Sequence, residues 1–319
     1  MPKSTANTGG VTAPAITPHP SISAPGARGW RDYALLLALA CCWSSTYPLT
    51  KIGLGSIPPV TFISARSLVA AAFLLVVLRI RGIRIPTDIK AWKLFAFQQT
   101  INSTIPFLVI TWAQLYVPAS NTVVLASTTP IFAFLITWAI TRHEPASLLK
   151  LAGAILGLAG TVAIIGLDAL SGFGKEIFAE IAILLATISF ACATIFGLRL
   201  SDYDPMVVAA GSLLFGGTVL LPVALIIDHP WTLQPSLRSV LALVALATVS
   251  TAAAMVIYFR LVQTLGSIGA TAQSYLRVPI GVAIAVAGLG EQLAPTAWIG
   301  LACVVVGVVA MTLPARKAA

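Results

Sequence analysis

Runs of apolar residues that match the thickness of a lipid bilayer recur along the whole chain. Two of them, Met206 to Ile227 and Pro295 to Leu313, contain no charged residue. A helix of about 20 residues crosses a hydrocarbon core of about 30 Å, and it satisfies its own backbone hydrogen bonds there. Alternating segments of about ten residues, typical of a transmembrane β-barrel, do not occur. The pattern therefore predicts an all-α integral membrane protein.

The spacing of the apolar runs predicts ten transmembrane helices joined by short connections. The predicted spans are 33–54, 59–79, 94–115, 119–141, 147–167, 177–199, 206–227, 238–261, 267–289 and 295–313. Only 9% of the residues are charged, against about 25% in soluble domains. A large soluble domain is therefore excluded.

Lysine and arginine residues set the predicted orientation. Most of them fall in segments that share a side with the N-terminus: Lys3, Arg28, Arg31, Arg79, Arg81, Arg84, Lys90, Lys93, Arg142, Lys150, Arg199, Arg260, Arg316 and Lys317. Only Lys51, Lys175 and Arg238 fall in the opposite segments. Because basic loops stay in the cytoplasm, we expect a multi-pass protein of the plasma (bacterial inner) membrane with both termini cytoplasmic. The net charge of +9 then calls for no nucleic-acid partner.

The remaining composition argues against metal sites and catalysis. Residues 1–28 are rich in Pro, Ser, Thr, Ala and Gly and lack an apolar segment, so we expect a disordered cytoplasmic tail. The four cysteines fall in apolar spans without metal spacing, and the three histidines fall outside the spans. We therefore expect no disulfide, no metal, no cofactor and no enzymatic activity.

The two halves of the chain share a pattern of prolines, acids and glycines. The first half carries Pro130, Glu144, Gly153 and Gly160, and the second carries Pro279, Glu291, Gly300 and Gly307. Each half holds five predicted spans, so the second must be inverted relative to the first, an architecture that transporters use. We assign the repeats to 29–168 and 169–313, followed by a cytoplasmic tail at 314–319. Coincidence among apolar helices rich in Gly and Pro is the competing explanation.

Polar residues at mid-membrane depth should face the bundle interior or a water-filled cavity. They concentrate in the first, third and fourth spans and in the sixth, eighth and ninth. The candidate substrate-binding residues are Trp43, Ser44, Tyr47, Gln98, Asn102, Ser103, Thr128, Thr251, Tyr258, Gln273 and Arg277. Gln98 and Asn102 are four residues apart and share one face of a regular helix. Ser and Thr also bond to their own helix or to neighbouring helices, and an interfacial aromatic belt is the alternative for Tyr258.

Arg277 is the most informative of these residues. It falls near the centre of the ninth span, whereas all ten acidic residues fall at span ends or in loops. A substrate carboxylate is one candidate partner for its guanidinium, and backbone carbonyls freed by a proline such as Pro130 are the other. Arg66 falls at a shallower position in the second span, and we interpret it mainly as structural.

The motifs resemble those of the EamA family of the drug/metabolite transporter superfamily. The matching residues are Trp43, Arg66, Pro130, Glu144 and Gly153 in the first half, and Tyr258-Phe259-Arg260-Leu261, Gly266, Pro279 and Leu289-Gly290-Glu291 in the second. The resemblance covers roughly residues 30 to 313. It implies a ten-helix inverted-repeat fold that exports or exchanges amino acids or other small metabolites. Arg277 departs from this pattern, because family members often carry an apolar residue there.

Three functions compete at this point. We expect a transporter of small metabolites, such as amino acids, that works by alternating access around a midplane cavity. Its expected partners are the bilayer and a small-molecule substrate, for which a carboxylate is one candidate group. A lipid-group flippase of the same fold is the first alternative, and a membrane-embedded enzyme is the second. Gly153, Gly157 and Gly160 form a small face for close helix packing, either within the chain or in a homodimer.

Overall fold

The computed structural model describes residues 30–113, 116–117, 119–141, 147–166, 174–280 and 295–313. Helices make up nearly all of these residues, and no β-strand occurs among them. The predicted tails at 1–28 and 314–319, together with Glu144 and Glu291, lie outside the described residues, as does the side chain of Tyr47.

The helices follow one another with short connections. The first half holds α1 (Trp30–Ser44), α2 (Thr46–Gly53), α3 (Pro59–Ile80), α4 (Ile89–Gln99), the π-helix η1 (Thr100–Thr104), α5 (Ile105–Ala113), α6 (Ala119–Ala126), α7 (Thr129–Ile136), the π-helix η2 (Thr137–Thr141) and α8 (Leu148–Ile165). The second half holds α9 (Ile177–Gly197), η4 (Leu198–Leu200), α10 (Pro205–Ile227), η5 (Pro230–Thr232), α11 (Leu237–Ala245), the π-helix η6 (Leu246–Ala253), α12 (Ala254–Thr271), a helical stretch at 273–280, and α14 (Pro295–Thr312).

Six described helical segments are long and apolar enough to cross a membrane. They are Pro59–Ile80, Thr122–Thr141, Leu148–Ile165, Ile177–Leu200, Pro205–Ile227 and Leu237–Thr271, and Thr296–Thr312 is a shorter apolar helix. The prediction of an all-α, multi-pass membrane protein is confirmed for the described part of the chain. The count of ten spans remains a prediction.

Local sequence explains where several helices begin. Proline opens α3 at Pro59 and α10 at Pro205, where its missing N–H leaves no unsatisfied donor. The side chain of Asp204 accepts a hydrogen bond from the backbone N–H of Met206, and Ser147 caps α8 through the N–H of Lys150. These signals keep the connections short, so the helices pack directly against one another.

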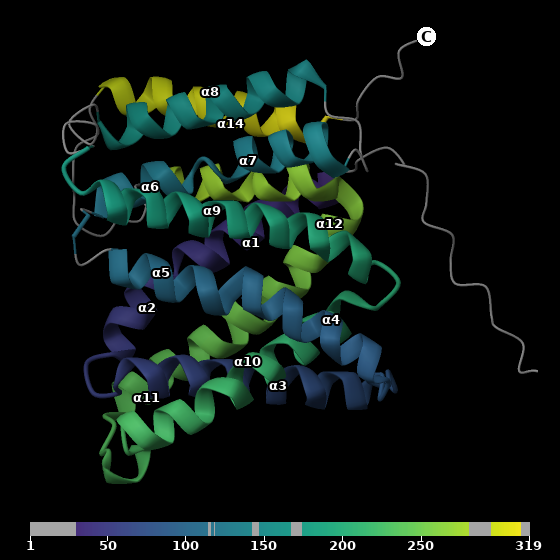
Figure 1. Cartoon of the computed structure of the whole chain (residues 1–319), viewed down its shortest axis with the longest axis vertical. Coiled ribbons are helices and arrows are strands. Elements are labelled where there is room, and N and C mark those ends of the chain that lie inside the picture. Colours follow the sequence, from purple (N-terminus) through teal and green to yellow (C-terminus); the bar gives the residue numbers. More distant parts are fainter. Residues whose placement is uncertain are drawn as a thin grey trace, which may run out of the picture.

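The helices stack in tiers, and the last helices of the two halves lie side by side. In Figure 1, α8 and α14 form one end of the stack, α3, α10 and α11 form the other, and α1, α9 and α12 lie between. The pairs α8–α14 and α3–α10 make the most extensive contacts among the described elements. The cavity described below lies in the middle tiers, between these two pairs.

Reciprocal glycine contacts join α8 to α14. A Cβ atom on Gly153 would lie 2.7 Å from the carbonyl oxygen of Gly307, and one on Gly307 would lie 2.6 Å from that of Gly153. Gly160 and Gly300 meet in the same way, with both distances 2.6 Å. The predicted small face of the fifth span is therefore covered by α14 of the same chain. The homodimer remains a prediction, but this face is not available as its contact surface.

Several predicted spans are interrupted where regular helices were expected. The first span turns at Ser45 between α1 and α2, and the fourth breaks between α6 and α7 just before Pro130. The loop expected between the eighth and ninth spans is instead a single break at Gly266 (φ 77°, ψ 178°), a conformation that glycine adopts without a steric penalty. The third span begins at Ile89 rather than at 94.

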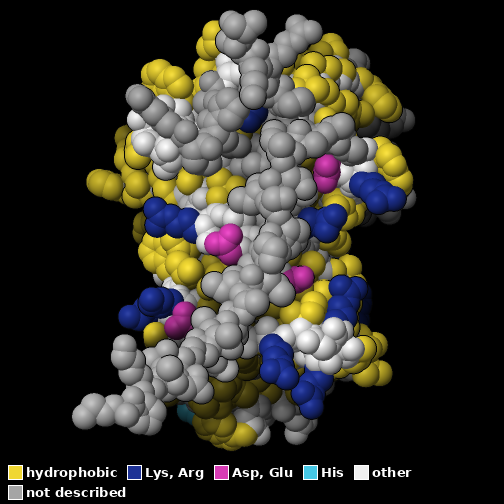
Figure 2. Space-filling view, turned by 90° about the vertical axis from the view of Figure 1, so that its right-hand side faces the viewer, with side chains coloured by type: hydrophobic (Ala, Val, Ile, Leu, Met, Phe, Trp, Pro, Cys, Tyr) yellow, Lys and Arg dark blue, Asp and Glu magenta, His cyan; other side chains and the backbone are white. Residues whose placement is uncertain are grey.

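Charged side chains gather on one face of the molecule. Figure 2 shows this face, where lysine and arginine side chains are scattered around a few acids. Arg79, Lys93, Arg199 and Arg260 are among the exposed basic residues of the chain. Large apolar side chains such as Val76, Leu185 and Ile226 are exposed along the helices. The exposed apolar side chains fit a helix bundle surrounded by lipid.

Candidate substrate cavity

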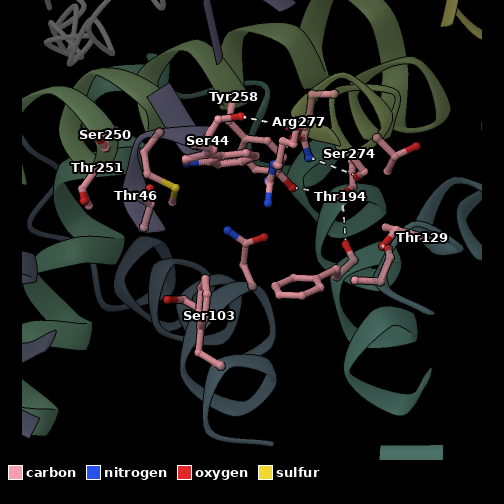
Figure 3. Close-up of a pocket in the computed structure, with 18 of the residues that line it drawn as sticks. Ser44, Thr46, Ser103, Thr129, Thr194, Ser250, Thr251, Tyr258, Ser274 and Arg277 are labelled. Carbon is pink, nitrogen blue, oxygen red and sulfur yellow. Dashed lines mark hydrogen bonds between the residues drawn. The ribbon is translucent and has the colours of Figure 1, made fainter. Parts of the chain in front are cut away.

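A cavity of about 480 Å³ lies between helices of both halves. That size suits a small metabolite. Its lining is Trp43, Ser44, Thr46, Arg66, Gln99, Asn102, Ser103, Phe107, Val123, Ala126, Ser127, Thr129, Ile165, Phe190, Thr194, Leu213, Ser250, Thr251, Met255, Tyr258, Thr271, Gln273, Ser274, Arg277 and Val278. Figure 3 shows hydroxyl groups surrounding a common space, with Arg277 and Tyr258 on one side and Ser103 on another.

Most of the predicted site residues meet at this cavity. Trp43, Ser44, Asn102, Ser103, Thr251, Tyr258, Gln273 and Arg277 all line it. They come from α1, η1, η6, α12 and the helical stretch at 273–280, so both halves of the chain contribute. Gln98 and Thr128 do not line it, and the side chain of Tyr47 is not described. The sequence thus predicted which helices line the cavity better than it predicted which side of each helix faces it.

Arg277 is held in place by contacts from two helices. Its Nε donates a hydrogen bond of 2.7 Å to Oε1 of Gln273, one helical turn earlier. Its Cζ lies 4.3 Å from the centroid of the Trp43 ring, a cation–π distance. The hydroxyl of Ser44 donates to the backbone carbonyl of Arg277 at 3.3 Å. These contacts fix the guanidinium at the wall of the cavity.

The helical stretch at 273–280 divides its side chains between the cavity and α8. Gln273, Ser274 and Arg277 line the cavity, whereas Tyr275 is fully buried and donates a 2.6 Å hydrogen bond to the carbonyl of Ala154. Gly157 makes this possible, because a Cβ there would lie 2.6 Å from the Tyr275 ring. The α8–α14 pair thus orients the helix that carries Arg277.

Tyr258 belongs to the cavity and not to an interfacial belt. Its ring is 3% exposed, its hydroxyl donates to Oγ1 of Thr194 at 3.1 Å, and its ring lies 5.7 Å from that of Trp43. Trp43 therefore contacts both Tyr258 and Arg277. These three side chains form a continuous aromatic and cationic wall.

Hydroxyl groups tie the break in the first span to η6. The Oγ atoms of Ser45 and Ser250 lie 2.9 Å apart, and the Ser45 hydroxyl also reaches the carbonyl of Cys42 at 2.8 Å. Ser250 and Thr251 both line the cavity from η6. The π-helix η6 and the junction between α1 and α2 therefore meet at one wall of the cavity.

The π-helix η1 explains why Gln98 was assigned to the wrong face. In a π-helix the hydrogen bonds run over five residues, so positions four apart no longer share a face across the start of η1. Gln99, rather than Gln98, lines the cavity together with Asn102 and Ser103. Gln98 is fully buried beside Gly197 of α9, and neither atom of its amide has a hydrogen-bond partner among the described residues.

Thr128 was predicted to line the cavity, but the residues on either side of it do so instead. Its hydroxyl donates to the carbonyl of Leu125 at 2.6 Å inside the break between α6 and α7. Its neighbours Ser127 and Thr129 line the cavity instead. The turn of the chain at this break decides which of the three consecutive hydroxyl residues faces inward, and a regular helical pattern does not contain that information.

The sequence interpretation of Arg66 as mainly structural missed its place in the cavity. Arg66 of α3 lines the cavity, and its Nε is buried without a hydrogen-bond partner among the described residues. The other lining residue with such a group is Gln99, whose Oε1 is also buried without a partner there. The signal available in the sequence was the charge of Arg66 inside an apolar span.

The described lining consists of groups that can bind a polar solute. Among the described residues that line the cavity there are two arginines and no Asp, Glu, His or Cys. No group of His, Cys, Asp and Glu able to hold a metal occurs among the described residues. Amides, hydroxyls and guanidinium groups can hold a polar or anionic solute by hydrogen bonds.

Comparisons with known proteins point to one family. The sequence profile of the EamA-like transporter family matches the chain twice, over residues 30–166 and 177–313. The uncharacterized inner membrane transporter YedA of Escherichia coli K12 is 28% identical over 283 residues, which cover 88% of this chain and 90% of that protein. A "probable terminal-alkyne amino-acid exporter" of Streptantibioticus cattleyicolor is 24% identical over 278 residues, covering 86% and 91%.

A solved crystal structure shares the fold. It matches with a TM-score of 0.72 at 20% identity, over 88% of this chain and 98% of that chain. The named relatives are transporters, which points away from enzymatic activity and supports a multi-pass membrane protein.

Proposed function

Because the chain belongs to the EamA-like transporter family, we propose that it carries a small metabolite with a carboxylate group, such as an amino acid, across the membrane. The protein binds this solute in the cavity and exposes it to the two sides in turn. Ten spans in two inverted repeats, with both termini in the cytoplasm, form the carrier. It works as an exporter or an exchanger.

The position of Arg277 is the observation that carries this proposal. A guanidinium fixed by Gln273 and Trp43 at a cavity wall offers charge-assisted hydrogen bonds to a carboxylate. The hydroxyls of Ser44, Thr251 and Ser274 at the same cavity suit the other polar groups of a metabolite. The naming of one relative as an amino-acid exporter supports the same class of solute.

Breaks and π-helices beside the cavity support alternating access. Carriers with repeats bind their solutes where helices are discontinuous near the midplane. The break at Ser45, the break before Thr129 and the π-helices η1 and η6 all lie next to lining residues. Such segments can change their backbone hydrogen bonding at low energetic cost, which suits helices that move against one another.

Purified protein in liposomes would test the proposal. We expect a screen of amino acids, organic acids and amines to yield a transported carboxylate, and its primary amide analogue to be transported less well. Arg277→Gln should lower the ratio of carboxylate to amide transport by about tenfold or more, since a hydrogen bond to a charged group contributes about 1.5–3 kcal/mol. Arg277→Lys should retain part of the ratio, because it keeps the charge and loses the planar fork.

Two controls make this test decisive. Arg238→Gln, at the start of α11 and outside the cavity, should leave the ratio unchanged. Each variant should elute as a monodisperse peak after detergent extraction. A well-folded Arg277→Gln protein with the wild-type ratio would show that Arg277 is structural.

A further inference from the structure

A groove on the outside of the bundle lies where α4, η1 and η2 of the first half meet α9 of the second. Its volume is about 1110 Å³, and it shares no lining residue with the candidate substrate cavity. Figure 1 shows α9 in the tier next to α4 and α5, which it contacts. Side chains that line the groove are exposed, Phe97 by 51% and Leu185 by 60%. The groove therefore opens towards the surroundings of the bundle.

Contacts across the groove show that its two main walls run in opposite directions. The rings of Phe97 and Phe196 lie 4.7 Å apart. Further along the first wall, the carbonyl of Ile101 accepts a 2.8 Å hydrogen bond from the Ser189 hydroxyl. The residue numbers rise along α4 and η1 while those of the partners on α9 fall. The start of α4 therefore lies beside the end of α9.

This antiparallel arrangement brings two basic side chains to one end of the groove. Lys93 precedes Phe97 by one helical turn, and Arg199 follows Phe196 by about one turn, so both lie on the same side of the ring pair. Both line the groove and both are exposed. Neither forms an ion pair with a described residue, and no acid lies among the described residues that line the groove. This end of the groove is therefore positively charged.

The rest of the groove is mostly apolar and as long as one leaflet of a bilayer. Along α9 the lining residues Leu185, Ile188, Cys192 and Ile195 recur every three or four positions, so they form one stripe. From Arg199 to Leu185 the chain rises by about 21 Å, at ~1.5 Å per residue. One leaflet is half of a hydrocarbon core of about 30 Å. The stripe is thus long enough for an acyl chain whose head group lies at the basic end.

From the charge at one end and the apolar stripe beyond it, we propose that this groove binds an anionic phospholipid. The phosphate lies at Lys93 and Arg199, and one acyl chain lies along α9. Basic pockets at the ends of transmembrane helices attract anionic head groups. In the predicted topology this end faces the cytoplasm, so the lipid comes from the inner leaflet. The site is separate from the substrate cavity and does not depend on which solute is carried.

A lipid in this position connects the two halves of the chain. Lys93 belongs to the first half and Arg199 to the second, so one head group contacts both. A ligand that binds only the folded protein stabilises it by mass action. The lipid should therefore raise the Tm of the purified protein as well as bind to it.

Native mass spectrometry of the purified full-length protein would test the site. The protein in detergent would be titrated with phosphatidylglycerol and with phosphatidylcholine that carries the same acyl chains. Each basic side chain near an anionic head group contributes about fivefold in affinity, so we expect phosphatidylglycerol to bind at least fivefold more tightly. It should also raise the Tm more than phosphatidylcholine does. This comparison needs no variant.

Charge variants would assign the preference to the two basic residues. The double variant Lys93→Gln, Arg199→Gln should bring the affinity ratio of the two lipids close to one. The matched control is Lys90→Gln with Arg260→Gln, because both residues are exposed and neither lines the groove. The control should keep the wild-type ratio.

A variant that fills the groove would test the place of the acyl chain. Cys192 is exposed and lines the groove, so Cys192→Trp should weaken the binding of both lipids. Ile181→Trp is its control, since Ile181 is 48% exposed on the same helix and does not line the groove. It should leave both affinities unchanged.

Four results would overturn the proposal. The first is equal affinity of the wild-type protein for the two lipids, and the second is an unchanged ratio in the double charge variant. The third is full displacement of phosphatidylglycerol by an equal concentration of inorganic phosphate, which would show a site for the head group alone. The fourth is a dimer in the spectrum that Cys192→Trp abolishes, which would make the groove a contact between copies of the chain.

Discussion

The guanidinium of Arg277 lies over the indole ring of Trp43, with 4.3 Å between Cζ and the ring centroid. One residue comes from the first half of the chain and the other from the second. Trp43 also contacts the ring of Tyr258. The contact therefore joins the two halves at the wall where the solute is proposed to bind, and a movement of one half against the other changes the environment of the charge.

Removing the ring of Trp43 should weaken solute binding. A cation–π contact contributes about 0.5–2 kcal/mol, so we expect Trp43→Leu to raise the KM for the transported carboxylate by about 2- to 30-fold. Trp43→Phe keeps an aromatic face and should lie between Leu and wild type. The measurement is initial uptake into liposomes over a range of solute concentrations.

Trp112→Leu is the control for this series. Trp112 is 47% exposed on α5 and does not line the cavity, although its ring lies near that of Tyr116. Its KM should stay at the wild-type value. A Trp43→Leu protein with an unchanged KM would refute the assignment of Trp43 to the binding wall.

Cysteine accessibility should separate the lining residues from their buried neighbours. In a background without Cys41, Cys42, Cys192 and Cys303, cysteine at Asn102, Thr251 or Gln273 should react with a hydrophilic thiol reagent. Cysteine at Gln98 should react much more slowly, because Gln98 is fully buried and outside the cavity. Mass spectrometry after timed labelling would measure both rates.

The informative comparison in this experiment is between the labelling rates at the adjacent positions 98 and 99. Gln98 and Gln99 are consecutive in the chain, and only Gln99 lines the cavity. A faster reaction at position 98 than at position 99 would mean that η1 is a regular α-helix and that the face predicted from the sequence holds. Excess transported solute should slow labelling at Gln273, which neighbours the bound carboxylate.

The same pair of residues shows how far the sequence determines the site. Hydropathy predicts the spans because burying apolar surface in lipid needs only length and composition. It also selects the polar helices, since polar groups avoid lipid. It does not predict which face of a helix turns inward once a π-helix adds a residue, so Gln98 was chosen over Gln99. The break at Ser45 is likewise a tertiary feature, supported by a contact with Ser250 far along the chain.

Arg66 shows a second limit of the sequence. Its depth in the second span was judged from its position alone, and that position is shallow. The cavity reaches it because α3 packs along α10 and brings Arg66 towards Gln99 and Leu213 at the lining. This packing depends on glycines such as Gly217, where a Cβ would lie 2.7 Å from Leu68. The pattern of apolar and polar residues does not predict such close contacts between helices.

Alanine at the glycine contacts of α8 and α14 should destabilise the protein. Gly153→Ala or Gly307→Ala places a methyl group against a backbone carbonyl that cannot move aside, and we expect a cost of about 1–3 kcal/mol. Thermal unfolding in detergent should show a lowered Tm for either variant. Gly197→Ala is the matched control, because its Cβ would meet its nearest neighbour, a Val262 methyl, at an ordinary 3.4 Å. Equal Tm values for all three would contradict the close helix contact.

Reporter fusions should place both termini in the cytoplasm. The reason is the uneven distribution of basic residues along the chain, because Arg79, Lys93, Arg199 and most of the others fall in segments that share a side with the termini in the predicted topology. A C-terminal fluorescent protein that folds only in the cytoplasm should be bright, and a C-terminal alkaline phosphatase should be inactive. Phosphatase inserted after Trp231, in the connection between α10 and α11, should be active. The reverse pattern would invert the topology.

The glycine contacts between α8 and α14 also limit how such a carrier can work. Gly153 meets Gly307 while Gly160 meets Gly300, so at these two points each helix lies directly against a backbone carbonyl of the other, which cannot rotate out of the way as a side chain can. Sliding one helix along the other would drive a carbonyl into the next side chain. We therefore expect α8 and α14 to move as one rigid unit. Because Tyr275 bonds to Ala154 of α8, we expect the stretch that bears Arg277 to move with this pair, and the opening of the cavity to involve the helices on its other side.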